Sequence, residues 1–511
     1  MAANRAVDDY AINTYGIPGE TLMQNAGYAV IEQMEKHGYL SNDPTILILA
    51  GKGNNGGDGF VIARGLMEKE LNVSLITVSD PQELKGDALF HYQLLVGLGL
   101  EAGVWESGAE QQTMISKSEV IVDALLGTGI SGEIREPYTE IITLCNKSEA
   151  RIVAVDVPSG VTGDDGEVLE PCIRAELTVS MGFGKQGCLF EPARSQSGKI
   201  ETVEIGFPED SLAHVEGKVL YQTEAEDFSP KDFSRPGASH KYSVGKVYII
   251  AGSRGFTGAA VLASKAALRS GAGLVKLALP GSLGIVAEQE SLETIVEYLP
   301  ETADGSFSQA GSAKLETGCA WANVVVIGPG IGRNTETLEL VRDLVAKVDK
   351  PLVLDADALF AIKDDLDLLQ QRSAPCIITP HLGEFLRLGT DYKDSKPPHW
   401  EAALAFAQTY GTHVLLKGAP SLLAYPDGTI MVNNSGHAGM ATAGSGDVLS
   451  GVLGGLWSQW PEHADVLRFG MYIHGKAADH MKTSKGTLGM IAGDIVEALP
   501  TVLKEYGGIP D

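Results

Sequence analysis

Strand-length runs of apolar, mostly β-branched residues alternate with helix-length segments along most of this chain. In the first half these runs cover residues 45–50, 73–78, 120–125, 151–157 and 177–181, and an amphipathic helix is predicted ahead of them over 20–36. This alternation is the signature of a parallel sheet covered by helices on its faces. We therefore predict an α/β domain with a parallel sheet.

The alternation stops and then restarts. Residues 207–241 are polar and without a period, which places a domain boundary there. New strand-length runs follow at 246–251, 274–279, 324–327, 351–354, 376–379 and 414–417. At 511 residues the chain is long enough for two such cores, so the sequence predicts a second α/β domain.

A glycine-rich segment follows the first strand. Residues 51–59 read GKGNNGGDG, and a helix is predicted after them over 60–69. The N–H groups of such a loop and the dipole of the next helix bind anions. A plain tight turn is the alternative, and the spacing of Gly51, Gly53 and Gly56 also fits a dinucleotide fingerprint, with Asp80 after the next strand. The Asn-Asn-Gly-Gly-Asp core favours a phosphate site that also offers oxygens to a hard cation or to hydroxyl groups.

Polar residues follow two further strands of the first half. Asp123 comes before the segment GTGISG at 127–132, and Asp156 opens DVPSG at 156–160. Either Asp alone could simply cap a turn. Ligands of open α/β sheets bind beyond the carboxyl ends of the strands, so three such segments in succession predict a ligand site at this edge.

The motifs LMQNAG, GKGNNGGDG, DALLGTGISG and DVPSG occur in this order, and over residues 1–215 the chain resembles the Rossmann-like NAD(P)H-hydrate epimerase family. The substrate of that family is hydrated, redox-inactive NADH or NADPH, whose R and S epimers are interconverted. The resemblance implies that the phosphates and ribose are bound by Asn54, Asn55, Gly56, Gly57, Asp58, Gly127, Thr128, Gly129, Ile130, Ser131, Gly132 and Glu133. It also implies a potassium ion (K+) bound by Asn55, Asp123 and Ser159, and a catalytic Asp156 beside the nicotinamide ring.

The second half carries comparable segments: AGS at 251–253, TGAA at 257–260, GPGIG at 328–332, DAD at 355–357, TPHLGE at 379–384, KGAPS at 417–421 and AGSGD at 443–447. The last one leads into a helix predicted over 448–456. It offers an anion site at the helix N-terminus and places Asp447 to take a proton from a substrate hydroxyl, the layout for phosphoryl transfer. Taken singly, GSGD could be only a helix cap, and His381 an ordinary loop histidine.

Over residues 225–505 these segments resemble the ribokinase-like ADP- or ATP-dependent NAD(P)H-hydrate dehydratases. The resemblance implies that Gly258, Ala259, Gly330, His381 and Asp447 bind the hydrate. It implies that the nucleotide, with Mg2+, is bound by Lys417, Gly418, Ala419, Pro420, Ser421 and Gly446. Asp447 would deprotonate the hydrate hydroxyl, which attacks the terminal phosphate before the phosphate ester is eliminated. Where the family often has Asn after Asp-Ala-Asp-Ala-Leu, this chain has Phe360.

Together the two halves predict a bifunctional enzyme, an isomerase fused to a lyase that repairs hydrated NADH and NADPH. A vitamin kinase of the ribokinase-like fold is the main alternative, but the epimerase-like half makes sense only if both halves share a substrate. A non-catalytic scaffold is disfavoured because Asp123, Asp156 and the NNGGD side chains are all present. The sequence does not distinguish ADP from ATP, or NADH hydrate from NADPH hydrate.

Acidic residues outnumber basic ones by 66 to 39, a formal net charge of −27. Such a surface repels nucleic-acid backbones, so we predict small-molecule partners, no nucleic acid, and phosphate groups held by local devices. The five cysteines are scattered without a C-x-x-C pair, and no apolar stretch suits a signal peptide or membrane span. We expect a cytoplasmic, membrane-free homo-oligomer with free, buried thiols.

Overall fold

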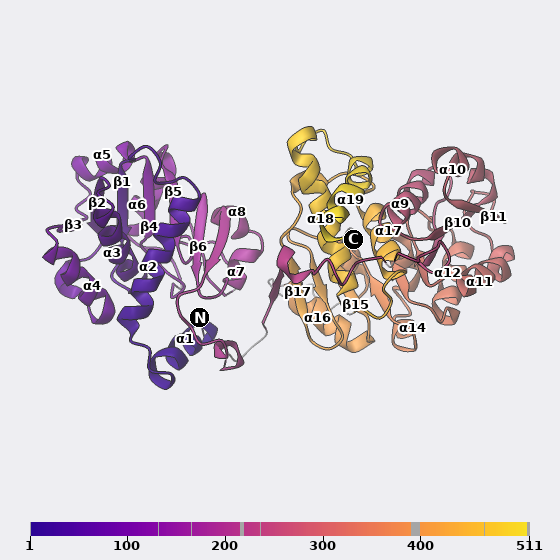
Figure 1. Ribbon diagram of the computed structural model, residues 1–511, viewed down its shortest axis with the longest axis horizontal. Helices are drawn as coiled ribbons and strands as arrows, with labels where there is room; N and C mark the ends of the chain where they lie inside the picture. Colours follow the sequence, from indigo (N-terminus) through magenta and orange to yellow (C-terminus); the bar gives the residue numbers. More distant parts are fainter. Residues whose placement is uncertain are drawn as a thin grey trace. The chain divides into compact units, whose positions relative to one another are not determined.

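The chain divides into two compact units, Met1–Lys218 and Val219–Asp511 (Figure 1). The computed structural model describes residues 2–130, 132–164, 166–214, 219–235, 237–389, 399–463 and 465–507, without the side chains of 2–5. Each unit is an α/β body with its own sheet, which confirms the predicted fold class.

The N-terminal unit is built on a seven-stranded sheet in which every neighbouring pair is parallel. Its strands, in spatial order, are β3 (Gly103–Val104), β2 (Val73–Thr77), β1 (Ile46–Ala50), β4 (Val120–Ala124), β5 (Arg151–Val155), β6 (Leu177–Met181) and β7 (Lys199–Val203). All five strands predicted from the sequence are present. The edge strands β3 and β7 were not predicted, because one is very short and the other is mostly polar.

Helices cover both faces of this sheet. Alternate residues of β1 point to opposite faces: Ile46 and Ile48 join a core with α2 (Gly19–Lys36), α3 (Asn54–Glu68) and α4 (Gly86–Gly97). Leu47 and Leu49 join a core with α5 (Ala109–Lys117) and α6 (Tyr138–Lys147). The shorter helical elements are α1 (Ala2–Asp9), the π-helix η1 (Tyr10–Thr14), η2 (Pro81–Glu83), α7 (Gln186–Leu189), α8 (Arg194–Ser197) and η3 (Ser211–His214).

The C-terminal unit has a mixed ten-stranded sheet. The spatial order is β11 (Ile295–Leu299), β10 (Leu274–Pro280), β9 (Lys246–Ile250), β12 (Val324–Ile327), β13 (Leu352–Leu354), β14 (Cys376–Ile378), β15 (His413–Leu416), β16 (Leu422–Ala424), β17 (Ile430–Asn433) and β8 (Tyr221–Thr223). Only the pairs that β16 forms with β15 and β17 are antiparallel. The six predicted strands are therefore a parallel block, and the carboxyl ends of these strands share one edge.

A layer of long helices buries one face of that sheet. Val247 and Ile249 of β9 pack in one core with α9 (Thr257–Arg269), α17 (Ser445–Trp457), α18 (Val466–Lys485) and α19 (Ala492–Tyr506). Tyr248 points to the opposite face, against Gly318 of α11 (Ser312–Trp321). The remaining helical elements are η4 (Ala225–Asp227), η5 (Gly281–Leu283), α10 (Gly284–Glu290), η6 (Gln309–Gly311), α11 (Ser312–Trp321), α12 (Thr335–Lys347), α13 (Asp357–Ile362), α14 (Asp367–Gln370), α15 (Leu382–Arg387), α16 (His399–Tyr410) and η7 (Ala438–Met440).

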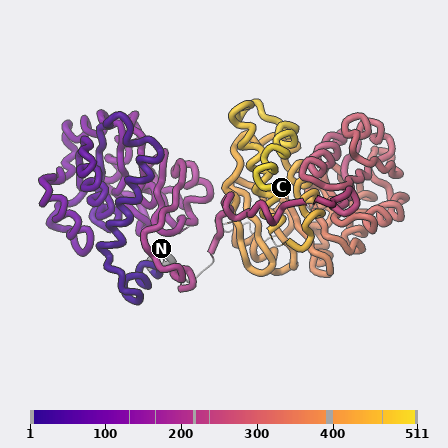
Figure 2. The backbone as a smooth tube through the Cα atoms, viewed as in Figure 1, coloured from indigo at the N-terminus to yellow at the C-terminus, as the bar shows by residue number. Residues whose placement is uncertain are grey.

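Residues 219–235 lie in the polar segment where the sequence places a domain boundary, and they form a strap along the C-terminal unit. After β8 pairs with β17 at the sheet edge, Phe228 and Phe233 are buried against the helix layer. The Phe233 ring stacks on Phe469 with centroids 3.9 Å apart, and the Phe228 ring lies 5.0 Å from the same ring. Figure 2 shows this magenta segment running across the unit. The strap ties the start of this unit to its C-terminal helices.

All five cysteines are buried and free, as predicted. No helix in the described part of the chain is both long and apolar enough to cross a membrane.

Candidate functional sites

The predicted ligand segments of the N-terminal unit meet at one cavity. It has a volume of about 560 Å³, within the usual range for small-molecule sites of roughly 300–1,000 Å³. The segments after β1, β4 and β5 all contribute, and the predicted residues that line the cavity are Asn54, Asn55, Asp58, Gly127, Thr128, Gly129, Ile130 and Asp156. Gly56 and Gly57 are buried in α3 behind it. Gly132 and Glu133 are not among the lining residues, and Ser131 lies outside the described residues.

Helix α3 begins at Asn54, not at residue 60, so the sequence prediction of a loop over the whole glycine segment is wrong. The reason is close packing. A Cβ on Gly56 would lie 1.8 Å from the carbonyl oxygen of Gly51, and one on Gly59 would lie 2.9 Å from Cβ of Ala124. The glycines let the first helical turn press against the strand ends, which brings the helix N-terminus to the cavity wall.

A buried polar cluster lies beside the start of α3. The carboxylate of Asp123 accepts hydrogen bonds from Ser159 Oγ at 2.6 Å and from Ser159 N at 2.8 Å. Burial raises the pKa of Asp123 to about 6, although these hydrogen bonds act in the opposite direction. Asn55 is 9% exposed, and neither its Oδ1 nor its Nδ2 has a hydrogen-bond partner among the described residues. Asn55 packs against Gly127, where a Cβ would lie 3.3 Å from Asn55 Cβ, and the preceding Leu126 N donates to Ser159 Oγ at 2.9 Å. An unpartnered amide in the neighbourhood of a carboxylate and a hydroxyl suits a small cation.

Asp156 is held in a strained position at the end of β5. Its φ is +67°, a conformation that side chains other than glycine adopt rarely and usually at functional sites. Its Oδ1 accepts a hydrogen bond from Met181 N at 3.1 Å and lies 2.7 Å from Lys185 Nζ. The Lys185 side chain is only 5% exposed and also donates to the carbonyl oxygens of Met181 and Phe183. Asp156 is thus presented to the cavity in one orientation.

Asp58 is a second carboxyl group that lines the cavity, and the charges of Asp156 and Lys185 act on its pKa. Burial raises the pKa of Asp58 well above its usual range, and the neighbouring carboxylates of Asp156 and Asp8 add to the rise. Lys185 acts in the opposite direction. The raised pKa of Asp58 favours its protonated form, while the carboxylate of Asp156 forms an ion pair with Lys185. Two carboxyl groups in such different environments are suited to proton exchange.

In the C-terminal unit the segment GPGIG lies against the start of α9. Gly330 has a φ of +63°, and a Cβ there would lie 2.8 Å from Cβ of Phe256 and 3.1 Å from Cβ of Ala259. Ser253 Oγ donates to the carbonyl oxygen of Gly330 at 2.7 Å. The predicted hydrate-binding residues Gly258, Ala259 and Gly330 are therefore neighbours at one edge of the sheet.

The segment AGSGD forms the first turn of α17. The helix begins at Ser445 after Gly444, whose φ is +91°, so the predicted start at residue 448 is wrong. Glycine at 444 permits the left-handed turn. Gly446 then lies beside Lys417, because a Cβ on Gly446 would be 3.3 Å from Lys417 Nζ.

Lys417 is surrounded by carboxylates. Its Nζ lies 2.8 Å from Oδ1 of Asp355 and 3.7 Å from Oε2 of Glu384, while Ser450 Oγ donates to the other oxygen of Asp355 at 2.7 Å. Burial, and next the carboxylate of Asp355, raise the pKa of Asp447 to about 7, and Lys417 opposes this rise. A base with a pKa near neutrality is well matched to accept a proton at physiological pH.

The other predicted nucleotide and hydrate ligands lie nearby in the fold. His381 is the N-cap of α15, where its Nδ1 accepts from Glu384 N at 3.3 Å, and its ring is exposed. Lys417 N donates to Pro380 O, which joins the two segments. Gly418, Ala419, Pro420 and Ser421 form the turn into β16, closed by a hydrogen bond from Gly418 N to Ser421 Oγ at 3.2 Å.

The two units match two families. The family described as "NAD(P)H-hydrate dehydratase" matches residues 247–501, and the family described as "YjeF-related protein N-terminus" matches residues 19–187. Over 506 residues the chain is 37% identical to a bifunctional NAD(P)H-hydrate repair enzyme of Moorella thermoacetica, covering 98% of this chain and 95% of that protein. The chain belongs to the bifunctional NAD(P)H-hydrate repair enzymes. It therefore combines an epimerase with an ADP/ATP-dependent dehydratase.

A second relative agrees with this placement. The repair enzyme of Thermofilum pendens is 35% identical, with 98% of this chain and 95% of that protein covered. A ribokinase-like protein of Enterococcus faecalis has a similar fold, with a TM-score of 0.50 and 23% identity over 56% of this chain and 96% of its own. An ADP/ATP-dependent NAD(P)H-hydrate dehydratase of Bacillus subtilis, crystallised with ATP and Mg2+, is 27% identical with a TM-score of 0.46, covering 53% of this chain and 94% of its own.

Three residues of this repair enzyme were not singled out from the sequence as site residues: Lys185, Asp355 and Glu384. Asp355 and Glu384 lie inside the motifs DAD and TPHLGE. Their proximity to the site could therefore have been inferred from these motifs. Lys185 lies in FGKQG, after β6, and no pattern marks it. In the described part of the chain no group of three or more His, Cys, Asp or Glu side chains is arranged to bind a metal.

Proposed function

We propose that residues 1–215 epimerise the R and S hydrates of NADH and NADPH in the 560 Å³ cavity, and that residues 225–505 dehydrate the S form with ADP or ATP. One observation carries this proposal. Each unit has its own sheet edge where a helix N-terminus and a positioned carboxylate, Asp156 or Asp447, lie together. An anion site beside an acid/base group is what a phosphate-bearing substrate requires.

In the epimerase unit, the start of α3 and the segment after β4 hold the phosphates and ribose. These contacts come from Asn54 to Asp58 and from Gly127 to Ile130. The residues that follow in the chain, Ser131, Gly132 and Glu133, are proposed to contribute to the same contacts. Asp156 exchanges a proton with the hydrated ring. Lys185 is a positioning residue, because its contact with Asp156 Oδ1 at 2.7 Å holds that carboxylate in one orientation.

The polar cluster behind this site fits a potassium ion. Asn55 Oδ1, the carboxylate of Asp123 and the hydroxyl of Ser159 would hold it, and the unpartnered amide of Asn55 supports this role. When bound, K+ supplies a fixed positive charge that stiffens the phosphate-binding segments.

In the dehydratase unit, Asp447 removes the proton from the hydroxyl of the hydrate. The hydroxyl oxygen then attacks the terminal phosphate of the nucleotide, whose anhydride bond breaks, so that ADP leaves AMP behind. Loss of the phosphate ester together with a ring proton restores the double bond of the dihydropyridine. Gly258, Ala259, Gly330 and His381 hold the hydrate, while Lys417 to Ser421 and Gly446 hold the nucleotide.

Mg2+ would accompany the nucleotide. In phosphoryl-transfer sites this ion is held by one or two carboxylates and by the nucleotide phosphates. Asp355 and Glu384 present carboxylates beside Lys417, at the edge where the phosphates are proposed to bind. When bound, Mg2+ would neutralise the negative charge that develops on the transferred phosphate.

The protein is also proposed to form a homo-oligomer. Apolar side chains are exposed on and near the edge strand β11, with Ile285 at 63%, Leu292 at 85% and Ile295 at 44%. An uncovered sheet edge flanked by apolar residues is a common interface. Light scattering coupled to gel filtration, repeated with Leu292→Glu, tests it: a monomeric mass for the unsubstituted protein contradicts the proposal.

The function is tested with the purified protein and a mixture of hydrate epimers. Dihydronicotinamide absorbance should rise only when ADP or ATP is added, and both epimers should be consumed. If absorbance does not recover with either nucleotide, the dehydratase proposal is wrong. If only one epimer is consumed and the other stays at its spontaneous rate of exchange, the epimerase proposal is wrong.

A further inference from the structure

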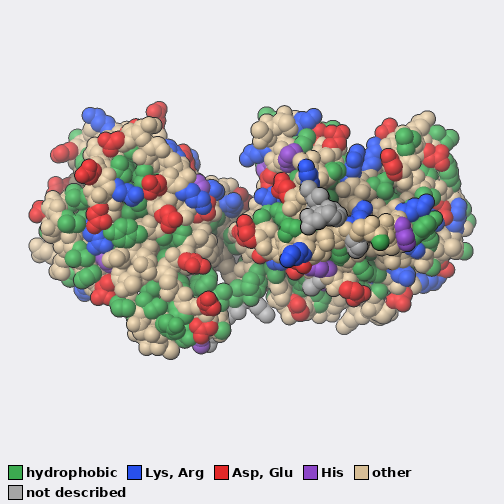
Figure 3. Space-filling view, in the orientation of Figure 1, with side chains coloured by type: hydrophobic (Ala, Val, Ile, Leu, Met, Phe, Trp, Pro, Cys, Tyr) green, Lys and Arg blue, Asp and Glu red, His purple; other side chains and the backbone are tan. Residues whose placement is uncertain are grey.

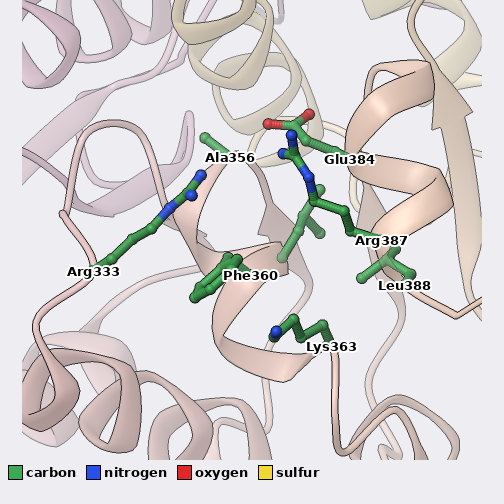
Figure 4. Close-up of a pocket in the computed structure, with 8 residues that line it drawn as sticks. Arg333, Ala356, Phe360, Lys363, Glu384, Arg387 and Leu388 are labelled. Atoms are coloured by element: carbon green, nitrogen blue, oxygen red, sulfur yellow. The ribbon is translucent and has the colours of Figure 1, made fainter.

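A small pocket in the C-terminal unit has no role in the reaction described so far. It is lined by residues from the loop after β12, from α13 and the residues that flank it, and from α15 and the residue after it (Figure 4). These residues are Arg333, Ala356, Leu359, Phe360, Lys363, Glu384, Arg387 and Leu388. Three of these side chains are basic. Acidic side chains are spread over both units on the face seen in Figure 3, and the net charge is −27, so a cluster of three cations stands out.

Phe360 organises two of the cations. The guanidinium carbon of Arg333 lies 4.4 Å from the centroid of the Phe360 ring, and Nζ of Lys363 lies 4.5 Å from it. Such cation–π contacts hold a charged group in place while leaving its N–H groups free to donate. Arg333 is further fixed by Asp357, whose Oδ1 lies 2.8 Å from its Nε. Phe360, at the position where the family often has Asn, therefore positions the side chains of Arg333 and Lys363.

Arg387 supplies the third cation and is the least constrained. It is exposed on α15, and within the described residues no carboxylate forms an ion pair with it. A guanidinium group presents a fork of donors that matches a phosphate group. A ligand with two negative charges would offset the mutual repulsion of Arg333, Lys363 and Arg387.

The pocket adjoins the proposed hydrate site. Arg333 directly follows the segment that contains Gly330, and Arg387 lies on the helix that His381 caps. Glu384 lines the pocket and also lies 3.7 Å from Lys417 Nζ. None of the proposed nucleotide ligands, Lys417 to Ser421 and Gly446, lines it. Arg333 and Arg387 therefore lie on the hydrate side of the site, while Glu384 connects the pocket to the proposed Mg2+ position.

From this arrangement we infer that Arg333, Lys363 and Arg387 around Phe360 form a subsite for a dianionic phosphate group of a nucleotide bound in the dehydratase unit. The favoured source is the 2′-phosphate of NADPH hydrate, which NADH hydrate lacks. The other source of the same chemistry is the terminal phosphate of the donor. The inference rests on the proposed hydrate site and assigns the dehydratase a preference for the phosphorylated substrate.

The test uses the full-length Arg387→Ala protein, with S epimers of NADPH hydrate and NADH hydrate measured separately at saturating ADP. We expect the ratio of kcat/KM for the two hydrates to fall roughly tenfold, because one charge-assisted contact to the 2′-phosphate is lost. Arg387→Lys should recover part of the ratio. The matched control is Arg269→Ala, which removes an exposed arginine at the end of α9 and should leave the ratio unchanged.

Two further outcomes complete the test. If the hydrate ratio is unchanged but KM for ATP rises relative to KM for ADP, the subsite is upheld with the donor phosphate as its ligand. If neither quantity changes in Arg387→Ala or in Phe360→Asn, the inference is overturned. Failure of the unsubstituted protein to convert NADH hydrate with ADP would instead contradict the proposed function, so the two failures are distinguishable.

Discussion

Asp447 faces two charged side chains that act on its pKa in opposite directions. Burial and the carboxylate of Asp355 favour the neutral acid, while the ammonium of Lys417 favours the ionised base, and the balance leaves a pKa of about 7. Asp355 is itself held by Lys417 and by Ser450. The pKa of this proposed base is therefore set by residues outside its own motif.

We predict that Asp447→Asn abolishes nucleotide-dependent recovery of NADH from its hydrate and leaves epimer exchange intact. The amide cannot accept the hydroxyl proton, and loss of a general base typically costs about 10²–10⁴-fold in rate. Absorbance at saturating ADP measures the first activity, and chromatographic separation of the epimers measures the second. Near-normal dehydratase turnover in the variant would contradict the role of Asp447.

The same carboxyl group predicts the pH dependence of the dehydratase. Because the base acts in its ionised form and its pKa is about 7, kcat should fall as the pH drops from 8 to 6, roughly tenfold per unit once below the pKa. In Lys417→Met the opposing cation is gone, so the midpoint should move to higher pH. A profile that is flat between pH 6 and 8, or one that shifts downward in Lys417→Met, would contradict this assignment.

At the scale of elements, helix and strand identities followed from periodicity, but the boundaries at the sites did not. Both α3 and α17 begin inside the glycine motifs that the sequence left as loops. Glycine disfavours helices on average, yet here it permits contacts such as that of Gly56 with Gly51. That gain in packing depends on partners distant in the fold, so local sequence could not reveal it.

The strap and Lys185 escaped prediction for a related reason. Phe228 and Phe233 sit in a polar stretch without any period, and their partners, such as Phe469, lie more than two hundred residues later. Lys185 reaches Asp156 only because β5 and β6 are neighbours in the sheet. The segments that follow predicted strands could be assigned to one edge in advance, whereas contacts of this kind require the fold.

A substitution of Phe228 tests how much the strap contributes to the stability of the C-terminal unit. Phe228 is buried to 3% exposure among Phe233, Phe469, Tyr472 and Tyr506, and Phe→Ala in such a site costs about 3–5 kcal/mol. We predict that Phe228→Ala lowers the unfolding temperature of the C-terminal unit by on the order of 10 °C. Calorimetry should show this shift alone, with Phe228→Leu giving a smaller one. An equal shift in the unfolding of the N-terminal unit would contradict it.

At the scale of the whole molecule, the two proposed active sites belong to separate folded units. Each unit has its own sheet and its own hydrophobic cores. Asp156 and Asp447 belong to different units, and substitutions at distant sites that share no partner usually act independently. The two activities should therefore fail one at a time.

The sharpest consequence concerns Asp156→Ala. The dehydratase should consume its preferred epimer at the normal rate and then stall, because only the N-terminal unit converts the remaining epimer. On a mixture of epimers the absorbance trace should be biphasic, with a slow phase that falls to the spontaneous rate of exchange. Asp80→Ala is the matched control, since Asp80 follows the neighbouring strand β2 and does not line the cavity. If Asp156→Ala converts both epimers as fast as the control does, Asp156 is not the epimerase group, even if the dehydratase assignment stands.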